Sequence, residues 1–256
     1  MMSEVRGRMS DFLPPTSKKN RKDQIMKTIS ITTSSIICGV CILENEKVLK
    51  EINLNNGLTH SESLMPLVSK ILEEVNLTLQ DMDLLAIDIG PGSFTGIRIG
   101  IATAKAFKDS LNIPCVGVNS LEGLSLNVKN TGVICSLIDA RRENVFAEIF
   151  ENIDGNYIVR RNPSFEDINN LLEELKNINP EYNITFVGDG AIKNKEKILS
   201  YLPNSQFIEN NELSAQNIGI IGLKNKDNLN YQNIEPLYLR KSEAEQKLEE
   251  KQNAEK

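Results

Sequence analysis

The sequence has a single histidine, His60, among its 256 residues. Metal sites and most acid–base catalysts draw on more than one histidine, so metal chemistry carried by this chain alone is not expected. The four cysteines are too few for a disulfide framework, and a hydrophobic signal segment is lacking, so we expect free thiols and a cytoplasmic location. No stretch approaches the roughly 18 uninterrupted apolar residues of a membrane-spanning helix, and no membrane contact is expected.

Positive charge is also scarce. Lysine and arginine number 29 against 35 aspartates and glutamates, which gives a net charge of -6. Binding nucleic acid through phosphates needs a basic face, so any nucleic acid must be held mainly by a partner protein. Hydrophobic residues at 40% and charged residues at 25% are typical of a globular protein with a core, and the length favours two compact lobes.

Residues 1–25 lack an apolar period and carry a small basic cluster, Lys18–Lys22. They are expected to lie outside the fold, as a disordered arm. Such an arm could bind nucleic acid, or the segment could simply precede a second start at Met26, where a strand-like run begins.

From Met26 the apolar pattern predicts the order βββαβαβα for residues 26–129, and the same order again for residues 130–235. Two copies of one topology indicate two lobes facing each other across a cleft. The segment 236–256 ends in a Glu- and Lys-rich tail. Helices are predicted at Ser61–Val75, Phe94–Leu111, Ser120–Val128, Ser164–Asn177, Ala191–Tyr201 and Ser214–Lys224.

The sharpest local feature is a glycine-rich turn, Gly90, Pro91, Gly92 and Ser93, between a predicted buried strand and a predicted helix. Such turns can direct backbone N–H groups at a phosphate. The turn lacks a P-loop lysine and the spacing of a dinucleotide fingerprint, and Pro91 removes one donor. A structural turn is therefore favoured over a phosphate site.

The helix after this turn has a face of small residues, because Gly96, Gly100 and Ala104 recur every four positions. Glycine in a helix costs about 1 kcal/mol relative to alanine, so close packing must offset that cost. The spacing predicts that another helix packs against this face. It does not decide whether that helix belongs to the same chain or to another subunit.

Other polar motifs have plain structural interpretations. Cys38 and Cys41 have a metal-like spacing, but they point to opposite faces of a predicted strand and are expected in the core. His60 is expected to make contacts at a helix entry, although a catalytic base is conceivable. The charged run from Asp139 to Glu143 and the Gly188–Gly190 turn are interpreted as hairpin and strand-to-helix turns, with nucleotide contact at the latter as an alternative.

Several of these strings together resemble the bacterial TsaB (YeaZ) family. The resemblance covers residues 26–240, and its strings are ITTSS, HSESLMPL, GPGSFTGIRIG, SLIDARRENVFAEIF, VGDGA and PLYLR. It implies an α/β fold of two RNase H-like lobes, as in the superfamily of actin-like and sugar kinase ATPases.

The resemblance also implies a role in forming N6-threonylcarbamoyladenosine beside the anticodon of tRNAs that read codons beginning with A. Family members are non-catalytic scaffold subunits that pair with the catalytic, metal-bearing TsaD. The ATPase TsaE joins that pair, TsaC supplies the threonylcarbamoyl-adenylate intermediate, and tRNA is reached through the complex. Alone, family members form a homodimer through the two first-lobe helices that they offer to TsaD. Carried onto this chain, the expected interface residues are Ser61, Leu64, Met65, Val68, Gly96, Arg98, Ile99, Gly100, Thr103, Ala104 and Phe107.

The sequence departs from this family at two positions. Thr32 stands where an aspartate is usual, and Asp88 precedes the glycine turn where a small or apolar residue is common. The first change argues against Mg-ATP held as a kinase holds it, and the second would repel phosphate. No catalytic, cofactor or metal residues are therefore expected, with ATP or a metal at a partner boundary left open. The rival hypothesis is a stand-alone enzyme, an ATPase, phosphotransferase or peptidase.

Overall fold

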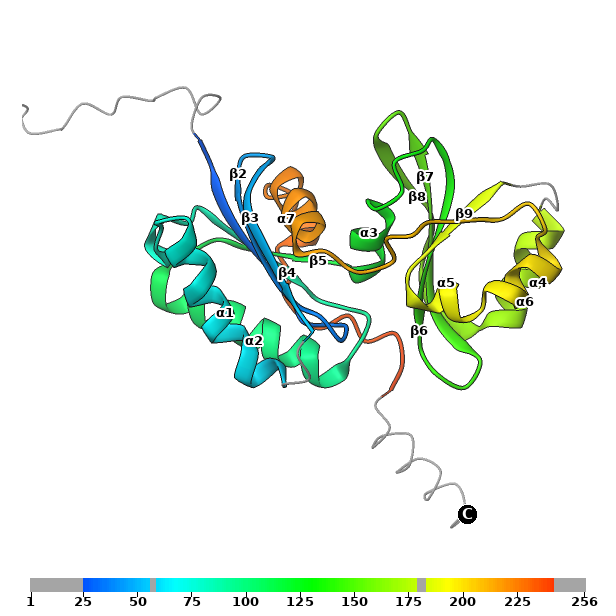
Figure 1. The fold of residues 1–256 in the computed structure, drawn as a ribbon, viewed down its shortest axis with the longest axis horizontal. Coiled ribbons are helices and arrows are strands. Elements are labelled where there is room, and N and C mark those ends of the chain that lie inside the picture. Colours follow the sequence, from blue (N-terminus) through cyan, green and yellow to red (C-terminus); the bar gives the residue numbers. More distant parts are fainter. Residues whose placement is uncertain (1–24, 56–58, 179–182, 242–256) are drawn as a thin grey trace, which may run out of the picture.

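The computed structural model describes residues 25–55, 59–178 and 183–241 as two α/β lobes lying side by side (Figure 1). Each lobe is built on a five-stranded sheet. The expectations for the arm at Lys18–Lys22 and for the tail beyond residue 241 concern residues outside these ranges.

The first sheet has the strand order β3-β2-β1-β4-β5, in which β1, β2 and β3 are antiparallel while β4 and β5 run parallel to β1. Short turns join the first three strands, and helices connect the parallel ones. The elements are β1 (Lys27–Thr32), β2 (Cys38–Glu44), β3 (Lys47–Leu54), α1 (His60–Glu74), η1 (Leu79–Asp81), β4 (Leu84–Asp88), α2 (Phe94–Leu111), β5 (Cys115–Val118) and α3 (Ser120–Ser125).

The second sheet repeats this plan with the order β10-β9-β6-β7-β8. Strands β6, β7 and β8 are antiparallel, and β9 and β10 complete the parallel part. The elements are β6 (Gly132–Asp139), β7 (Asn144–Ile153), β8 (Asn156–Asp167), α4 (Ile168–Ile178), β9 (Ile184–Val187), α5 (Asp189–Lys193), α6 (Lys195–Tyr201), β10 (Gln206–Phe207), α7 (Ala215–Lys224) and η2 (Leu229–Tyr231).

The predicted fold of two RNase H-like lobes with repeated βββαβαβα order is confirmed. Several boundaries differ from the sequence interpretation, and the helix predicted at Ser120–Val128 already ends at Ser125. Residues 164–167, predicted as helix, continue strand β8 and pair with Asn144–Ala147 of β7. The predicted helix Ala191–Tyr201 is two helices that meet at Asn194, and the first of them begins at Asp189.

The first sheet is covered on both faces. Helices α1 and α2 pack on the face formed by residues such as Ile29 and Ile31, and α7 packs on the opposite face against Leu43 and Ala86 (Figure 1). Helix α7 follows the second lobe in sequence, yet its contacts are with β1, β2 and β4. Helix α3 likewise follows β5 of the first sheet and packs on β6 and β7. The two helices therefore tie the lobes together.

None of the described helices is long and apolar enough to cross a bilayer.

Candidate functional site

The sequence motifs meet at one edge of each sheet, where the parallel strands have their carboxyl ends. The Ser93 N–H donates to the Ser34 carbonyl at 2.7 Å, which joins the glycine turn to the end of β1. The His60 ring nitrogen Nε2 lies 2.8 Å from the Ser35 carbonyl, so the start of α1 is fastened to the same loop. In the second lobe the tip of the β6–β7 hairpin is hydrogen bonded to the start of α5. Ligands of open α/β sheets bind at such edges, so this edge is where a ligand site is expected.

The glycine turn is packed against the end of β1. Gly90 has φ of +96°, a conformation that favours glycine. A Cβ at Gly92 would lie 2.3 Å from the Ser34 carbonyl oxygen. The two glycines are therefore needed for the backbone conformation of the turn and for its close contact with Ser34.

Most donors of the turn already have partners within the chain. The N–H groups of Gly90, Ser93 and Gly96 donate to a carboxylate, a carbonyl and a hydroxyl at 2.9, 2.7 and 3.2 Å. Pro91 has no N–H. A phosphate cradle needs converging, unpaired N–H groups, and this turn has few to offer.

The Asp88 carboxylate is fully buried behind the turn. It accepts hydrogen bonds from the Ser120 hydroxyl at 2.5 Å, the Thr32 hydroxyl at 2.7 Å and the Gly90 N–H at 2.9 Å, and also from the Ser34 hydroxyl. Burial raises the pKa of Asp88, and these hydrogen bonds act in the opposite direction. The repulsion of phosphate expected from Asp88 stays a prediction, and the structure shows that the carboxylate is enclosed by its own donors.

Mg-ATP, which the rival hypothesis of a stand-alone ATPase requires, does not fit the first-lobe residues. A hydroxyl, Thr32, occupies the end of β1 and donates to Asp88 instead of offering a carboxylate. The Asp88 oxygens are used inside the protein, and the turn N–H groups are largely paired. Within the described residues, no three His, Cys, Asp or Glu side chains gather as metal ligands would.

The small-residue face of α2 is turned into the chain's own core. A Cβ at Gly96 would lie 1.9 Å from the Thr33 carbonyl oxygen, and one at Gly100 would lie 2.5 Å from the Thr33 hydroxyl and 3.1 Å from Ile87. Ala104 is also fully buried. The helix predicted to pack on this face is α1 of the same chain, but only its first residue does so: a Cβ at Gly96 would lie 3.1 Å from the His60 ring, while Thr33 after β1 and strand β4 occupy the rest. These three residues are not available to a partner.

The other expected interface residues divide between the inner and outer faces of α1 and α2. Buried with the small residues are Leu64, Val68 and Phe107. On the outside, Ser61, Met65 and Arg98 are exposed and Ile99 and Thr103 are half-buried. Met65 is the most apolar of these, with 48% of its surface exposed. Only some of the predicted interface residues therefore lie on the outer face of α1 and α2.

The four cysteines are free and buried, as predicted. Cys38 packs in the cluster under α1 and α2, whereas Cys41 packs under α7, so the two thiols face opposite sides of the sheet. Burial raises the pKa of the Cys38 thiol to about 11. A metal site needs deprotonated thiols that lie on the same side of the strand. These two thiols face opposite sides, and burial favours their protonated form, so the pair is not suited to a metal.

A polar cluster that the sequence did not reveal lies between α3 and the second sheet. The Glu148 side chain on β7 is only 3% exposed and accepts a hydrogen bond from the Asn119 amide. Glu122 on α3 accepts from the Tyr231 hydroxyl at 2.8 Å. Burial raises the pKa of Glu148 to about 8, with the charge of Glu122 adding and the Asn119 amide opposing. Burial likewise raises the pKa of Glu122 to about 7, opposed by Tyr231.

These two carboxyl groups predict a pH dependence of stability. A carboxyl group whose pKa is raised by folding binds more protons in the native state, so its stabilisation is complete below the unfolded value and is lost as pH rises through the folded value. The free energy of unfolding should fall by about 2–4 kcal/mol between pH 5 and pH 8 through each of these groups. Urea denaturation across that range measures the slope. Glu148→Gln should flatten it, and an unchanged slope in this variant would contradict the assignment.

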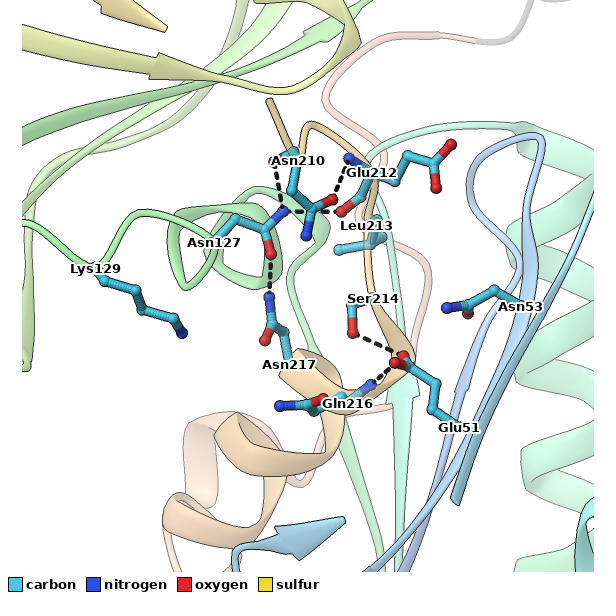
Figure 2. A pocket seen from close by; sticks show the side chains of 10 residues that line it. All are labelled: Glu51, Asn53, Asn127, Lys129, Asn210, Glu212, Leu213, Ser214, Gln216 and Asn217. Atoms are coloured by element: carbon cyan, nitrogen blue, oxygen red, sulfur yellow. Dashed lines mark hydrogen bonds between the residues drawn. The ribbon is translucent and has the colours of Figure 1, made fainter. Parts of the chain in front are cut away.

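A polar pocket of about 240 Å³ lies where β3, α3 and the start of α7 meet (Figure 2). Most of its polar groups bond to one another. The Glu51 carboxylate accepts from the Ser214 hydroxyl at 2.7 Å and the Gln216 N–H at 2.9 Å, and Asn217 donates to Asn127 at 2.7 Å. The hydrogen bonds among the lining residues thus hold the start of α7 in place. Its lining residues are Glu51, Asn53, Asn127, Lys129, Asn210, Glu212, Leu213, Ser214, Gln216 and Asn217.

Comparison with known proteins gives consistent results. Residues 48–248 match the family model described as TsaD, tRNA N6-adenosine threonylcarbamoyltransferase. The tRNA threonylcarbamoyladenosine biosynthesis protein TsaB of Bacillus subtilis is 30% identical over 235 residues, which cover 89% of this chain and 100% of that protein. The TsaB protein of Haemophilus influenzae is 25% identical over 234 residues, covering 88% and 98%.

Solved structures give the same picture of the fold. YeaZ from Pseudomonas aeruginosa superposes with a TM-score of 0.66 at 19% identity, covering 84% of this chain and 100% of that chain. At this identity the match supports the two-lobed architecture and nothing finer.

Proposed function

The chain belongs to the TsaB (YeaZ) family, and from this premise we propose that it is a non-catalytic subunit in tRNA threonylcarbamoyladenosine biosynthesis. Its role there is to bind and position a TsaD-type catalytic subunit. The proposal rests above all on family membership, since the relatives are named for this biosynthesis. The small-residue face of α2 no longer supports it, because that face is buried within the chain.

The chemistry of the described residues is consistent with an accessory role. The single histidine contacts a backbone carbonyl, the Asp88 carboxylate is enclosed, and the cysteines are buried. A catalytic subunit needs an accessible nucleophile, base or metal set. The chemistry is therefore assigned to partner proteins, and any ATP or metal to a boundary with them.

The outer face of α1 and α2 is the surface proposed to bind TsaD. Its two helices lie side by side on the outside of the first lobe (Figure 1). Exposed Met65, Ala102 and Ala106 give it small and apolar side chains, beside exposed charged ones such as Lys70 and Arg98. Methionine and small residues at the centre of a patch suit a protein partner.

The same face is proposed to form a homodimer when the chain is alone, so dimer and complex exclude each other. A TsaE-type ATPase would join the assembled pair, and tRNA would be bound through the complex. The net charge of -6 supports this last assignment, because the chain itself has no excess of phosphate-binding side chains.

Reconstitution tests the proposed function. Purified TsaC-, TsaD- and TsaE-type proteins from the same organism, with tRNA, threonine, bicarbonate and ATP, should form threonylcarbamoyladenosine only when this chain is added. Formation at full rate without the chain would overturn the proposal. Hydrolysis of ATP or peptide by the chain alone would favour the stand-alone enzyme instead.

The interface assignment predicts the effect of one surface charge. Met65→Glu should weaken binding of the TsaD-type subunit by at least about 10-fold, because the carboxylate would be desolvated at the contact. Ile192→Glu on α5 is the matched control, since Ile192 is 47% exposed against 48% for Met65. Isothermal titration calorimetry measures both affinities. Equal affinities for the two variants would place the interface elsewhere.

A further inference from the structure

The segment Glu235–Arg240, which we call the strap, runs from the first lobe to the second near the carboxyl end of the chain (Figure 1). The Leu237 N–H donates to the Ile89 carbonyl at 2.8 Å, directly before the glycine turn. Glu235 forms an ion pair with Lys105 of α2 at 2.6 Å. The strap thus begins along the carboxyl end of β4 and the side of α2.

Tyr238 anchors the strap on α2. Its ring stacks on Phe94 with centroids 4.5 Å apart and an angle of 13° between the rings. The Arg98 Nε donates to the Tyr238 hydroxyl at 2.7 Å, and the guanidinium carbon lies 5.6 Å from the Tyr238 ring centre. Arg98, expected from the sequence as a partner contact, is therefore already engaged within the chain. Stacked rings joined to a guanidinium form a rigid contact.

Arg240 anchors the strap on the second lobe. Its Nη1 donates to the Ala140 carbonyl at 2.8 Å, at the tip of the β6–β7 hairpin. Its guanidinium carbon lies 5.7 Å from the Phe146 ring centre and 5.8 Å from that of Phe165. Leu239 packs on the same cluster. Only one residue, Leu239, lies between the two anchors, so their Cα atoms are at most about 7 Å apart and the strap has almost no slack.

We propose that the strap couples the outer face of α1 and α2 to the second lobe, so that a protein partner seated on that face also restrains the β6–β7 hairpin. The inference rests on the proposed function, because it assigns a regulatory consequence to the same face. Coupling between two sites is reciprocal. If partner binding tightens the second-lobe anchor by some factor, a change that releases this anchor must weaken partner binding by the same factor.

Arg240→Ala tests the coupling at a position where the guanidinium contacts the Ala140 carbonyl and the Phe146 and Phe165 rings of the second lobe. The affinity for the TsaD-type subunit should fall by about 5-fold or more, the lower end of typical coupling between sites. Arg142→Ala, at an exposed arginine of the same hairpin, is the matched control and should keep wild-type affinity. Wild-type affinity in both variants would overturn the proposal.

A second measurement does not require the partner. Hydrogen–deuterium exchange on the free chain should show faster exchange at residues 139–144 in Tyr238→Ala, although Tyr238 contacts the other lobe. The milder Tyr238→Phe, which removes only the hydroxyl bonded to Arg98, should act in the same direction. If the wild-type chain formed no complex, the proposed function would fail, but the exchange rates would still show whether the strap links the two lobes. Unchanged exchange in both variants would overturn this link.

Discussion

Gly96→Ala should destabilise the free chain by about 2–4 kcal/mol, the range of overpacked core positions. Alanine inside a helix is ordinarily about 1 kcal/mol more favourable than glycine, so the expected sign is opposite to the helix propensity. The cause is the Thr33 carbonyl oxygen, which would lie 1.9 Å from the new Cβ. Backbone atoms of β1 cannot yield without disturbing the sheet. Urea denaturation of the purified variant measures the change.

Thr95→Ala is the matched control for this experiment. Thr95 is exposed in the same first turn of α2, so its truncation should change the free energy of unfolding by less than about 0.5 kcal/mol. A Gly96→Ala protein as stable as wild type, with weakened binding to the TsaD-type subunit, would show that the small-residue face serves a partner after all.

Asp88→Ala should cost about 3–5 kcal/mol of stability. The substitution would leave the hydroxyls of Thr32, Ser34 and Ser120 and one backbone N–H without their buried acceptor. Unsatisfied buried groups cost about 1–3 kcal/mol each, and partial pairing among the hydroxyls reduces the sum. Thermal and chemical denaturation should agree on the loss.

Asp83→Ala provides the comparison, because Asp83 accepts a backbone N–H at an exposed position. Its loss should cost less than about 1 kcal/mol. Asp88→Asn retains one carbonyl acceptor and should lie between the two. A stable Asp88→Ala variant that abolished threonylcarbamoyladenosine formation in the reconstituted system would instead make Asp88 a functional carboxylate.

The repeated fold follows from apolar periodicity, and long or fully buried elements were predicted within a residue or two. Helix Phe94–Leu111 agrees with the structure, and the helix predicted at Ser61–Val75 is observed one residue earlier, at His60–Glu74. Residues 164–167 were predicted as helix but form a strand, because their conformation depends on pairing with β7. No local sequence pattern indicates that pairing. Pro163 is tolerated there since β8 is the edge strand of its sheet.

The candidate site was less predictable than the fold. A stripe of glycines indicates close packing, but its partner is set by the tertiary arrangement, and here the partners are mainly Thr33 after β1 and strand β4, with α1 in contact only through His60. The role of Asp88 depends on hydrogen bonds from three hydroxyls whose residues lie 32 to 56 positions away in sequence. The strap and the Glu148 cluster also depend on contacts between distant segments, so no spacing could have found them.

The placement of α7 has a consequence for the polypeptide as a whole. A fragment ending at the boundary between the lobes would leave one side of its sheet bare, with Leu43, Ala86 and Val116 facing water. The carboxyl-terminal fragment would in turn carry an unpartnered helix with its apolar side exposed. Neither half is a self-sufficient folding unit, so nascent amino-terminal strands must wait for α7 to leave the ribosome before their sheet is fully covered.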